Sequence, residues 1–315
     1  MNYIQNNICV VLPTKNESDQ ISKVISDIFN LFKTLQLNKP VIIITDDSKD
    51  DTRKLAKEAG AEVINGGGKG LGFAMFQGLK HALKFSPKYI LTCDSDGQTD
   101  INEIPKFLEP LENGKADLVI GSRFSKPNLI DYRYRWINRF GVIVLSKILR
   151  SFTGQKITDS HGGLRAMTYN VANELEMLGV HTYVQETIID ASEKGFRIIE
   201  IPSVWKKRKS GKSRVVGSIP TYIFYTLPIL IIRSKQYIKW TYSIGILFIL
   251  FAIFYFVFIS WESSFEFKTM FSRLPSFVLI SVLIIAGIQL FFFGFIIQMI
   301  KNIKYRLDRM DQLKK

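Results

Sequence analysis

The chain has few of the residues that build disulfide frameworks and sulfur- or nitrogen-ligated metal sites. Its 315 residues include two cysteines, Cys9 and Cys93, and three histidines, His81, His161 and His181. Both cysteines fall in predicted strands, where a small buried thiol is the ordinary interpretation. The histidines lack ligand spacing, and neither a Ser/His/Asp order nor a Cys/His pair stands out. The composition therefore excludes a disulfide framework and a cysteine-based metal site.

Charged residues are missing from two long stretches, 240–261 and 274–300. About 20 apolar residues allow a helix to cross the hydrocarbon core, where it satisfies its own backbone hydrogen bonds. Trp240, Tyr242 and Trp261 lie at the ends of the first stretch, as amphipathic rings do at an interface. The sequence therefore predicts a two-helix transmembrane anchor over residues 237–300, in preference to a pair of buried core helices.

A third uncharged stretch, 215–232, is interrupted by Gly217, Pro220 and Pro228. It is either a third span or a set of helices lying along the membrane. The tail 301–315 is strongly basic, whereas the loop 262–273 is balanced, so the positive-inside rule puts the C-terminus and the preceding domain in the cytoplasm. That requires an even number of spans, so we expect 215–236 to be interfacial. The first predicted strand is too short to be a signal peptide.

The net charge of +14 comes with a particular distribution of basic residues. They gather beside the apolar stretches: Lys206, Lys207, Arg208, Lys209, Lys212 and Arg214 before them, and Lys301, Lys304, Arg306, Arg309, Lys314 and Lys315 after them. Nucleic acid is one interpretation of such a charge. Near anionic headgroups, however, each Lys or Arg contributes about 1 kcal/mol of attraction. We therefore expect a lipid bilayer as a partner and no nucleic acid; a homo-oligomer is compatible with the sequence.

Residues 1–214 read as a soluble α/β domain. Apolar runs at 8–12, 41–45, 89–93 and 118–120 predict buried parallel strands, and 18–37 and 72–85 have helical spacing. Ligands of open parallel sheets bind beyond the carboxyl ends of the strands. Polar clusters follow the four runs in turn: Pro13-Thr14-Lys15-Asn16-Glu17, Asp46-Asp47-Ser48, Asp94-Ser95-Asp96 and Gly121-Ser122-Arg123.

The cluster Asp94-Ser95-Asp96-Gly97-Gln98 carries the most chemistry. Two carboxylates that flank one residue at a strand end can face a common cation, and oxygen ligands suit Mg²⁺ or Mn²⁺. Such an ion is often completed by substrate phosphates. Alone, the pattern is more often a solvated turn, but its place directly after a strand favours a metal site.

A glycine-rich loop, residues 66–72, opens the second predicted helix and contains Lys69. Exposed amides, a helix N-terminus and a lysine could hold phosphate, and a flexible turn is the equal alternative. The loop is not a Walker A sequence, because Lys69 is followed by glycine.

Taken in order, these segments resemble family 2 glycosyltransferases of GT-A fold, in particular the dolichyl- or polyprenyl-phosphate sugar synthase branch. The resemblance rests on residues 10–17, 42–52, 68–70, Asp94-Ser95-Asp96-Gly97-Gln98, 121–123, 159–165 and 208–214. It implies inverting transfer of one sugar from a UDP- or GDP-hexose to a polyprenyl phosphate at the cytoplasmic membrane face. Where the family has an acidic pair before serine, this chain has Asp46-Asp47-Ser48, and which aspartate meets the base is open.

The resemblance also implies roles for individual residues. Nucleotide-binding residues would be Pro13, Thr14, Glu17, Asp46, Asp47, Lys69, Asp94 and Ser95; metal ligands Asp94, Asp96 and Gln98; catalytic residues Asp96, Arg123 and Asp159; and acceptor-phosphate ligands Arg123, Arg139 and Arg208. Each arginine has the alternative of a solvated or headgroup-facing side chain. Asp159 would orient the acceptor or an arginine, or form a structural ion pair. Glu186 stands where related enzymes with hydroxyl acceptors carry their base, and here it would structure the site.

Two other functions remain open from the sequence. The first is transfer from the same donor to a different lipid or glycan acceptor. The second is a non-catalytic membrane scaffold built on a degenerate transferase domain. The intact pair of Asp94 and Asp96 favours an enzyme.

Overall fold

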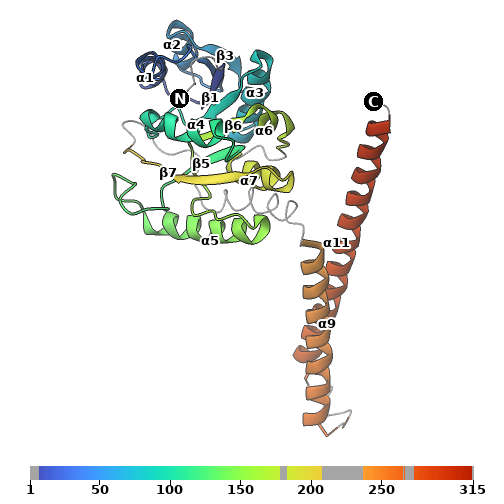
Figure 1. Ribbon diagram of the computed structural model, residues 1–315. Helices are drawn as coiled ribbons and strands as arrows, with labels where there is room; N and C mark the ends of the chain where they lie inside the picture. The colour runs from blue at the N-terminus through green and yellow to red at the C-terminus, as the bar shows by residue number, and fades with distance from the viewer. Residues whose placement is uncertain (1–6, 178–182, 208–236, 265, 267–272, 314–315) are drawn as a thin grey trace. The chain divides into compact units, whose positions relative to one another are not determined.

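The computed structural model describes residues 7–177, 183–207, 237–264, 266 and 273–313 (Figure 1). The chain divides into two compact units, Met1–Arg233 and Ser234–Lys315, which are considered separately. The predicted basic loop 208–214 and interfacial segment 215–236 lie outside the described residues, as does Arg208.

The first unit is built on a seven-stranded sheet in the order β3-β2-β1-β4-β6-β5-β7. The strands are β1 (Ile8–Thr14), β2 (Val41–Asp46), β3 (Glu62–Asn65), β4 (Tyr89–Thr92), β5 (Leu118–Ser122), β6 (Arg165–Thr168) and β7 (Ile198–Pro202). Neighbouring strands are parallel except where β6 runs antiparallel to β4 and β5. The predicted mostly parallel sheet is confirmed; β3, β6 and β7 were not predicted.

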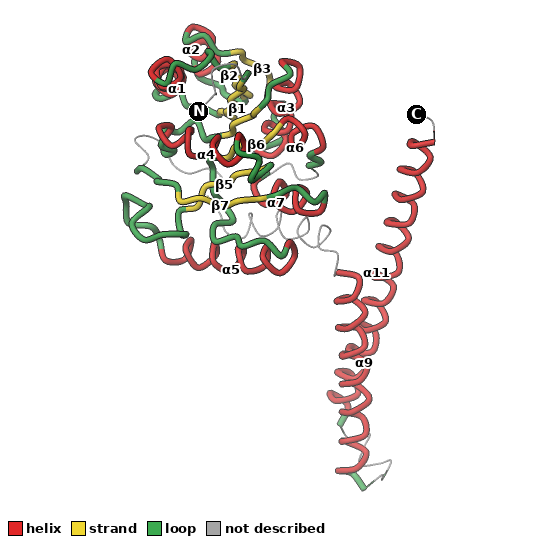
Figure 2. Tube along the Cα trace, viewed as in Figure 1, coloured by secondary structure: helices red, strands yellow, loops and turns green. Residues whose placement is uncertain are grey.

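Helices cover both faces of this sheet (Figure 2). The core on one face includes residues of α1 (Ile21–Thr34), α2 (Thr52–Glu58) and α4 (Ile104–Glu112); that on the other includes residues of α3 (Leu71–Ala82), α5 (Trp136–Thr153), α6 (Tyr169–Glu174) and α7 (Val184–Glu193). Two short 3-10 turns, η2 (Leu83–Phe85) and η3 (Ile101–Glu103), complete the unit. Strand residues alternate between the cores: Val10 and Leu12 join the first and Val11 the second. Both faces are therefore buried, as continuous apolar runs predict.

One glycine sets how closely α3 approaches the sheet. A Cβ on Gly78 would lie 2.4 Å from Cγ1 of Val11 on β1 and 2.8 Å from Cγ2 of Thr45 on β2. Real side chains do not approach so closely, and a larger residue here would push α3 off the strands. The tight packing holds the glycine-rich loop before α3 beside the end of β2.

The second unit contains two long apolar helices, α9 (Tyr237–Glu262) and α11 (Leu274–Leu313). Within them, Ile238–Glu262 and Leu274–Ile300 are long and apolar enough to cross a membrane, as predicted. The helices pack closely through small residues, since a Cβ on Gly245 would lie 2.9 Å from the carbonyl oxygen of Gly287. Arg273 and Glu262 form an ion pair with atoms 2.5 Å apart between the two helices' connected ends.

Candidate active site

The loops after β1 and β2 are bound to each other by side-chain hydrogen bonds. Thr14 Oγ1 donates to Asp46 Oδ1 over 2.9 Å, and Ser48 Oγ donates to the same oxygen over 2.5 Å. Arg53 Nε donates to the other carboxylate oxygen of Asp46 over 3.2 Å. The Asp46 side chain is fully buried. Its two oxygens therefore hold the local structure together.

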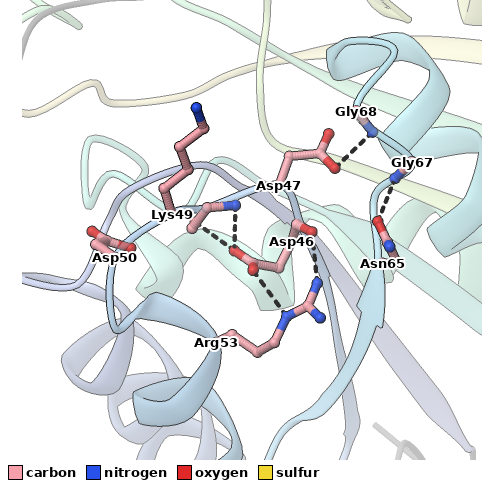
Figure 3. Close-up of a pocket in the computed structure, with 9 residues that line it drawn as sticks. Asp46, Asp47, Lys49, Asp50, Arg53, Asn65, Gly67 and Gly68 are labelled. Atoms are coloured by element: carbon pink, nitrogen blue, oxygen red, sulfur yellow. Dashed lines mark hydrogen bonds and ion pairs between the residues drawn. The ribbon is translucent and has the colours of Figure 1, made fainter.

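Asp47 occupies a different position on the same loop. Its Oδ1 accepts a hydrogen bond of 2.8 Å from the backbone N–H of Gly68, in the glycine-rich loop. Figure 3 shows Asp46 turned toward Arg53 and Asp47 turned toward Gly68 on the opposite wall. Gly67 and Gly68 have φ of +86° and +68°, a region that favours glycine, so the loop can present its amides here.

An open, polar pocket with a volume of ≈ 600 Å³ lies between the loop after β2 and the glycine-rich loop. Its lining residues are Asp46, Asp47, Ser48, Lys49, Asp50, Arg53, Asn65, Gly67 and Gly68. The pocket thus joins two of the segments that were predicted to bind nucleotide. Lys69, also predicted, is exposed and has its Nζ 4.8 Å from the ring centroid of Phe73.

The acidic cluster after β4 lies beside this first group of loops. Ser95 Oγ donates to the carbonyl of Pro13 over 2.9 Å. Asp96, which is buried, accepts a 3.0 Å hydrogen bond from the backbone N–H of Gln98. Gln98 Nε2 donates to the carbonyl of Lys206 over 3.2 Å. The cluster is therefore attached on one side to the end of β1 and on the other to the segment that follows β7.

The ligand type of these residues suits a hard divalent cation. A Cβ on Gly163 would lie 2.6 Å from Oδ2 of Asp94, so the carboxylate occupies space that only glycine leaves open. Asp94 and Asp96 supply the oxygen ligands that Mg²⁺ and Mn²⁺ prefer, and those ions keep several positions for water and phosphate. Among the residues that the structure describes, no group of three or more His, Cys, Asp or Glu side chains could hold a metal. The ligand roles of Asp94, Asp96 and Gln98 stay predictions.

A buried ion pair connects the end of β5 to the segment before β6. Arg123 Nε and Nη2 donate to the two carboxylate oxygens of Asp159 over 2.6 Å and 2.8 Å, and the Arg123 backbone N–H donates to Oδ2 over 3.0 Å. Burial opposes ionisation of Asp159, but the charge and hydrogen bonds of Arg123 outweigh it and hold the pKa of Asp159 below its usual value. Both residues are therefore charged at neutral pH, in bidentate geometry.

A second layer of hydrogen bonds fixes this pair. Glu200 on β7 accepts the backbone N–H of Asp159 over 2.8 Å. Ser160 N donates to Ser146 Oγ on α5 over 2.9 Å. Gly162 makes the closest approach, because a Cβ there would lie 1.8 Å from the carbonyl oxygen of Gly121. The ion pair thus has little freedom to move.

Aromatic side chains surround the Arg123 guanidinium. Its Cζ lies 4.4 Å from the ring centroid of Trp205, 5.4 Å from that of Phe124 and 5.5 Å from that of Tyr134. Arg139 Cζ lies 5.8 Å from the same Phe124 ring, so two of the three predicted acceptor arginines meet at one aromatic side chain. Such contacts stabilise cations in desolvated surroundings.

Trp205 also joins the two parts of the site. A Cβ on Gly163, already against Asp94, would lie 3.0 Å from Cζ2 of Trp205. The neighbouring residue Lys206 donates its backbone N–H to the carbonyl of Gln98 over 2.9 Å. The acidic cluster and the Arg123 pair therefore both lie next to one tryptophan, which sequence reasoning missed because no local pattern marks it.

Arg165 is a further residue without a predicted role. It is fully buried at the start of β6, and its Nε donates to the carbonyl of Gly162 over 3.1 Å. Its Nη1 and Nη2 have no hydrogen-bond partner among the described residues. Burial lowers the pKa of Arg165, while Tyr183, Asp159 and Asp94 favour its charged form. A buried cation thus lies near the acidic groups of the site.

Two remaining candidates lie close by. Glu186 is buried in the first turn of α7. Burial and the Arg123 charge lower the pKa of His161 to about 4, so that its imidazole is neutral at pH 7. His161 follows Ser160, whose hydroxyl lies 2.8 Å from Nδ1. These contacts do not give Glu186 or His161 a role in a chemical step.

Comparison with known proteins identifies the family. The family described as glycosyl transferase family 2 matches residues 9–175. An uncharacterised protein of Methanocaldococcus jannaschii, MJ1222, is 32% identical over 205 residues, which are 63% of this chain and 81% of that protein. UDP-N-acetylglucosamine–dolichyl-phosphate N-acetylglucosaminyltransferase of Methanococcus voltae is 29% identical over 62% of this chain and 84% of its own length.

A solved structure with the same fold is glucosyl-3-phosphoglycerate synthase from Mycobacterium tuberculosis, crystallised with Mn²⁺, uridine diphosphate and phosphoglyceric acid. The TM-score is 0.55 at 20% identity, over 73% of this chain and 79% of that chain. This likeness confirms the predicted fold class. Because the family match covers more than half of the sequence, the chain belongs to glycosyl transferase family 2.

Proposed function

We propose that this glycosyltransferase transfers one sugar from a nucleotide-sugar to a polyprenyl phosphate, with inversion at the anomeric carbon. The observation that carries the proposal is that the Asp94–Asp96 cluster and the Arg123–Asp159 pair both lie next to Trp205. The Asp94–Asp96 cluster suits a nucleoside diphosphate with its cation, and the Arg123–Asp159 pair suits an anionic acceptor. The similarity to a dolichyl-phosphate transferase supports the acceptor.

The donor nucleotide would occupy the pocket between the loop after β2 and the glycine-rich loop after β3. Asp46 uses both carboxylate oxygens within the protein, so Asp47 is the aspartate that we assign to the nucleoside. Asp94 and Asp96 would hold a divalent cation at the diphosphate, as Mn²⁺ in the structural relative suggests. When bound, that ion supplies positive charge to the leaving diphosphate.

The acceptor would bind beside Arg123 and Arg139. A phosphate monoester has a second pKa of about 6, so much of it is already dianionic at pH 7 and needs no strong base. One phosphate oxygen forms the bond to the anomeric carbon as the bond from that carbon to the nucleoside diphosphate breaks. Asp159 orients Arg123 through two hydrogen bonds, which would hold the positive charge of the guanidinium in place for the acceptor.

The membrane assignment belongs to the same proposal. The two apolar helices of the second unit would anchor the protein, with the transferase unit and the C-terminus in the cytoplasm. A polyprenyl tail stays in the bilayer, so an anchored enzyme meets its acceptor at headgroup level.

A donor panel tests the function. Purified full-length protein in liposomes with polyprenyl phosphate receives radiolabelled UDP- and GDP-hexoses with Mg²⁺ or Mn²⁺. Label entering the organic phase with one donor, and lost with a chelator, is the expected result. Nucleotide binding without transfer would point to another lipid or glycan acceptor. If no nucleotide binds, the result would favour the alternative of a non-catalytic membrane scaffold.

The paired substitutions Asp46→Asn and Asp47→Asn separate the two roles. Asp47→Asn should weaken nucleotide binding about tenfold while leaving the melting temperature unchanged, since an amide oxygen still accepts from Gly68. Asp46→Asn should destabilise the unit by about 1–3 kcal/mol because its charged oxygens organise two loops. Titration calorimetry and thermal unfolding measure the two effects. Reversal of the pattern would exchange the assignments.

A further inference from the structure

One helix of the transferase unit exposes an apolar face. Among the described residues of this unit, five large hydrophobic side chains are exposed, and four belong to α5. Trp136 is 77% exposed, Phe140 61%, Ile143 48% and Val144 41%. The successive spacings of four, three and one positions put them on one side of the helix. Soluble proteins rarely leave such a patch without a partner.

The same helix and its approach carry charge of one sign. Between residues 132 and 153 there are five basic residues and no acidic ones. The basic side chains, all exposed, are Arg133, Arg135, Arg139, Lys147 and Arg150. Exposed Trp and Phe together with Lys and Arg on one amphipathic helix are typical of segments that lie in a membrane interface.

The inner face of α5 fixes which side points outward. Val142, Ser146 and Leu149 are buried, and Leu149 belongs to the core on that face of the sheet. Ser146 Oγ donates to the carbonyl of Val142 over 2.7 Å and accepts from Ser160 N over 2.9 Å. Because Ser160 follows Asp159, the orientation of α5 is tied to the Arg123–Asp159 pair. Figure 1 shows α5 as the lowest helix of the unit in that view.

We propose that α5 is a membrane-docking helix: its apolar side chains enter the headgroup–acyl boundary of an anionic bilayer and its basic side chains contact lipid phosphates. Charge complementarity favours an anionic lipid surface over a second copy of α5 as the partner. Two copies would place five basic residues against five basic residues, with no carboxylate between them. The same chain carries two helices long enough to span a membrane, so a bilayer lies within reach of the unit. The inference extends the proposed function, since it brings Arg123 and Arg139 to the depth of a lipid phosphate.

A depth measurement tests the docking without any assay of transfer. The native cysteines are buried, so Ile143→Cys in the full-length protein can carry a spin label selectively. In nanodiscs containing anionic lipid, we expect this label to be more accessible to dissolved oxygen than to an aqueous nickel complex. A label at Lys54→Cys, on the exposed side of α2, should show the reverse. Equal accessibility at the two positions would overturn the proposal. Dipolar coupling between labels at position 143 would overturn it in favour of a second copy.

A functional variant adds a second readout. The double substitution Phe140→Asp and Ile143→Asp should reduce transfer to long-chain polyprenyl phosphate in bilayers by about tenfold. Nucleotide affinity and transfer to a short-chain soluble acceptor should stay at the wild-type level, which excludes misfolding. Equal loss with both acceptors would contradict docking. If the wild type transfers no sugar at all, the proposed function fails while the depth result still stands on its own.

Discussion

Replacing Asp96 by Asn is expected to lower the rate of sugar transfer by about a thousandfold or more, with the chain still folded and inserted in the membrane. The amide oxygen of Asn can keep the hydrogen bond that Asp96 Oδ1 accepts from Gln98. The substitution therefore preserves local structure and removes one negative charge where we propose that a divalent cation binds. Transfer from saturating donor and Mn²⁺ affinity, measured on the same preparation, report the two consequences.

A matched substitution controls for loss of charge alone. Glu58 is exposed on α2, and Glu58→Gln should leave transfer within about twofold of wild type because surface changes of this kind are close to neutral. Circular dichroism and retention in washed membranes establish that Asp96→Asn is folded and inserted. A folded variant that transfers sugar within tenfold of wild type would remove Asp96 from the catalytic set.

Breaking the ion pair between Arg123 and Asp159 should produce the largest loss of stability. Asp159→Asn leaves the Arg123 guanidinium buried without its counter-charge, and such a loss costs about 3–5 kcal/mol. Asp117→Asn is the matched control, since Asp117 pairs with Arg197, whose side chain is 57% exposed. Ion pairs at the surface contribute little to stability, because water and salt screen them. Denaturant unfolding in detergent micelles compares the two variants.

The same pair predicts how stability depends on pH. The pKa of Asp159 is lower in the folded protein than its usual value of about 3.9, so its contribution is complete above about pH 4. That contribution is lost as the pH falls through the folded pKa. The difference in unfolding free energy between wild type and Asp159→Asn should therefore shrink below pH 4. Equal stability of the Asp159→Asn and Asp117→Asn variants at pH 7 would contradict the buried-pair argument.

The fold was predictable where the local signal was strong. Short runs that are apolar at every position, such as Val10-Val11-Leu12, are typical of strands buried on both faces. The four strands predicted from such runs are β1, β2, β4 and β5. β6 was missed because it has four residues and opens on Arg165, whose charge contradicts a buried strand. β7 includes Glu200 and ends at Pro202, so its pattern resembles a loop. Tertiary pairing, and not local preference, makes both segments strands.

In the candidate site, too, the residues with a local sequence signal were predicted and those defined by tertiary contacts were not. Polar residues directly after predicted strands were expected at one edge of the sheet, and the structure joins Asp46, Asp47 and the glycine-rich loop in one pocket. The contact of Trp205 with Arg123 links residues 82 positions apart and has no sequence signature. The unpaired Nη atoms of Arg165 also required coordinates, because burial of a charge cannot be read from composition.

The antiparallel strand β6 has a consequence for the order in which the protein is made. Its pairing joins Thr92 to Arg165, and that of β5 with the edge strand β7 joins Leu118 to Ile198. Strands β4 and β5 therefore wait for partner residues that are synthesised much later. Long-range pairings of this kind slow folding and leave strand edges open meanwhile. Trp205 leaves the ribosome shortly before the first apolar helix, at Tyr237. Completion of the transferase unit and emergence of the first apolar helix are therefore nearly simultaneous events during translation.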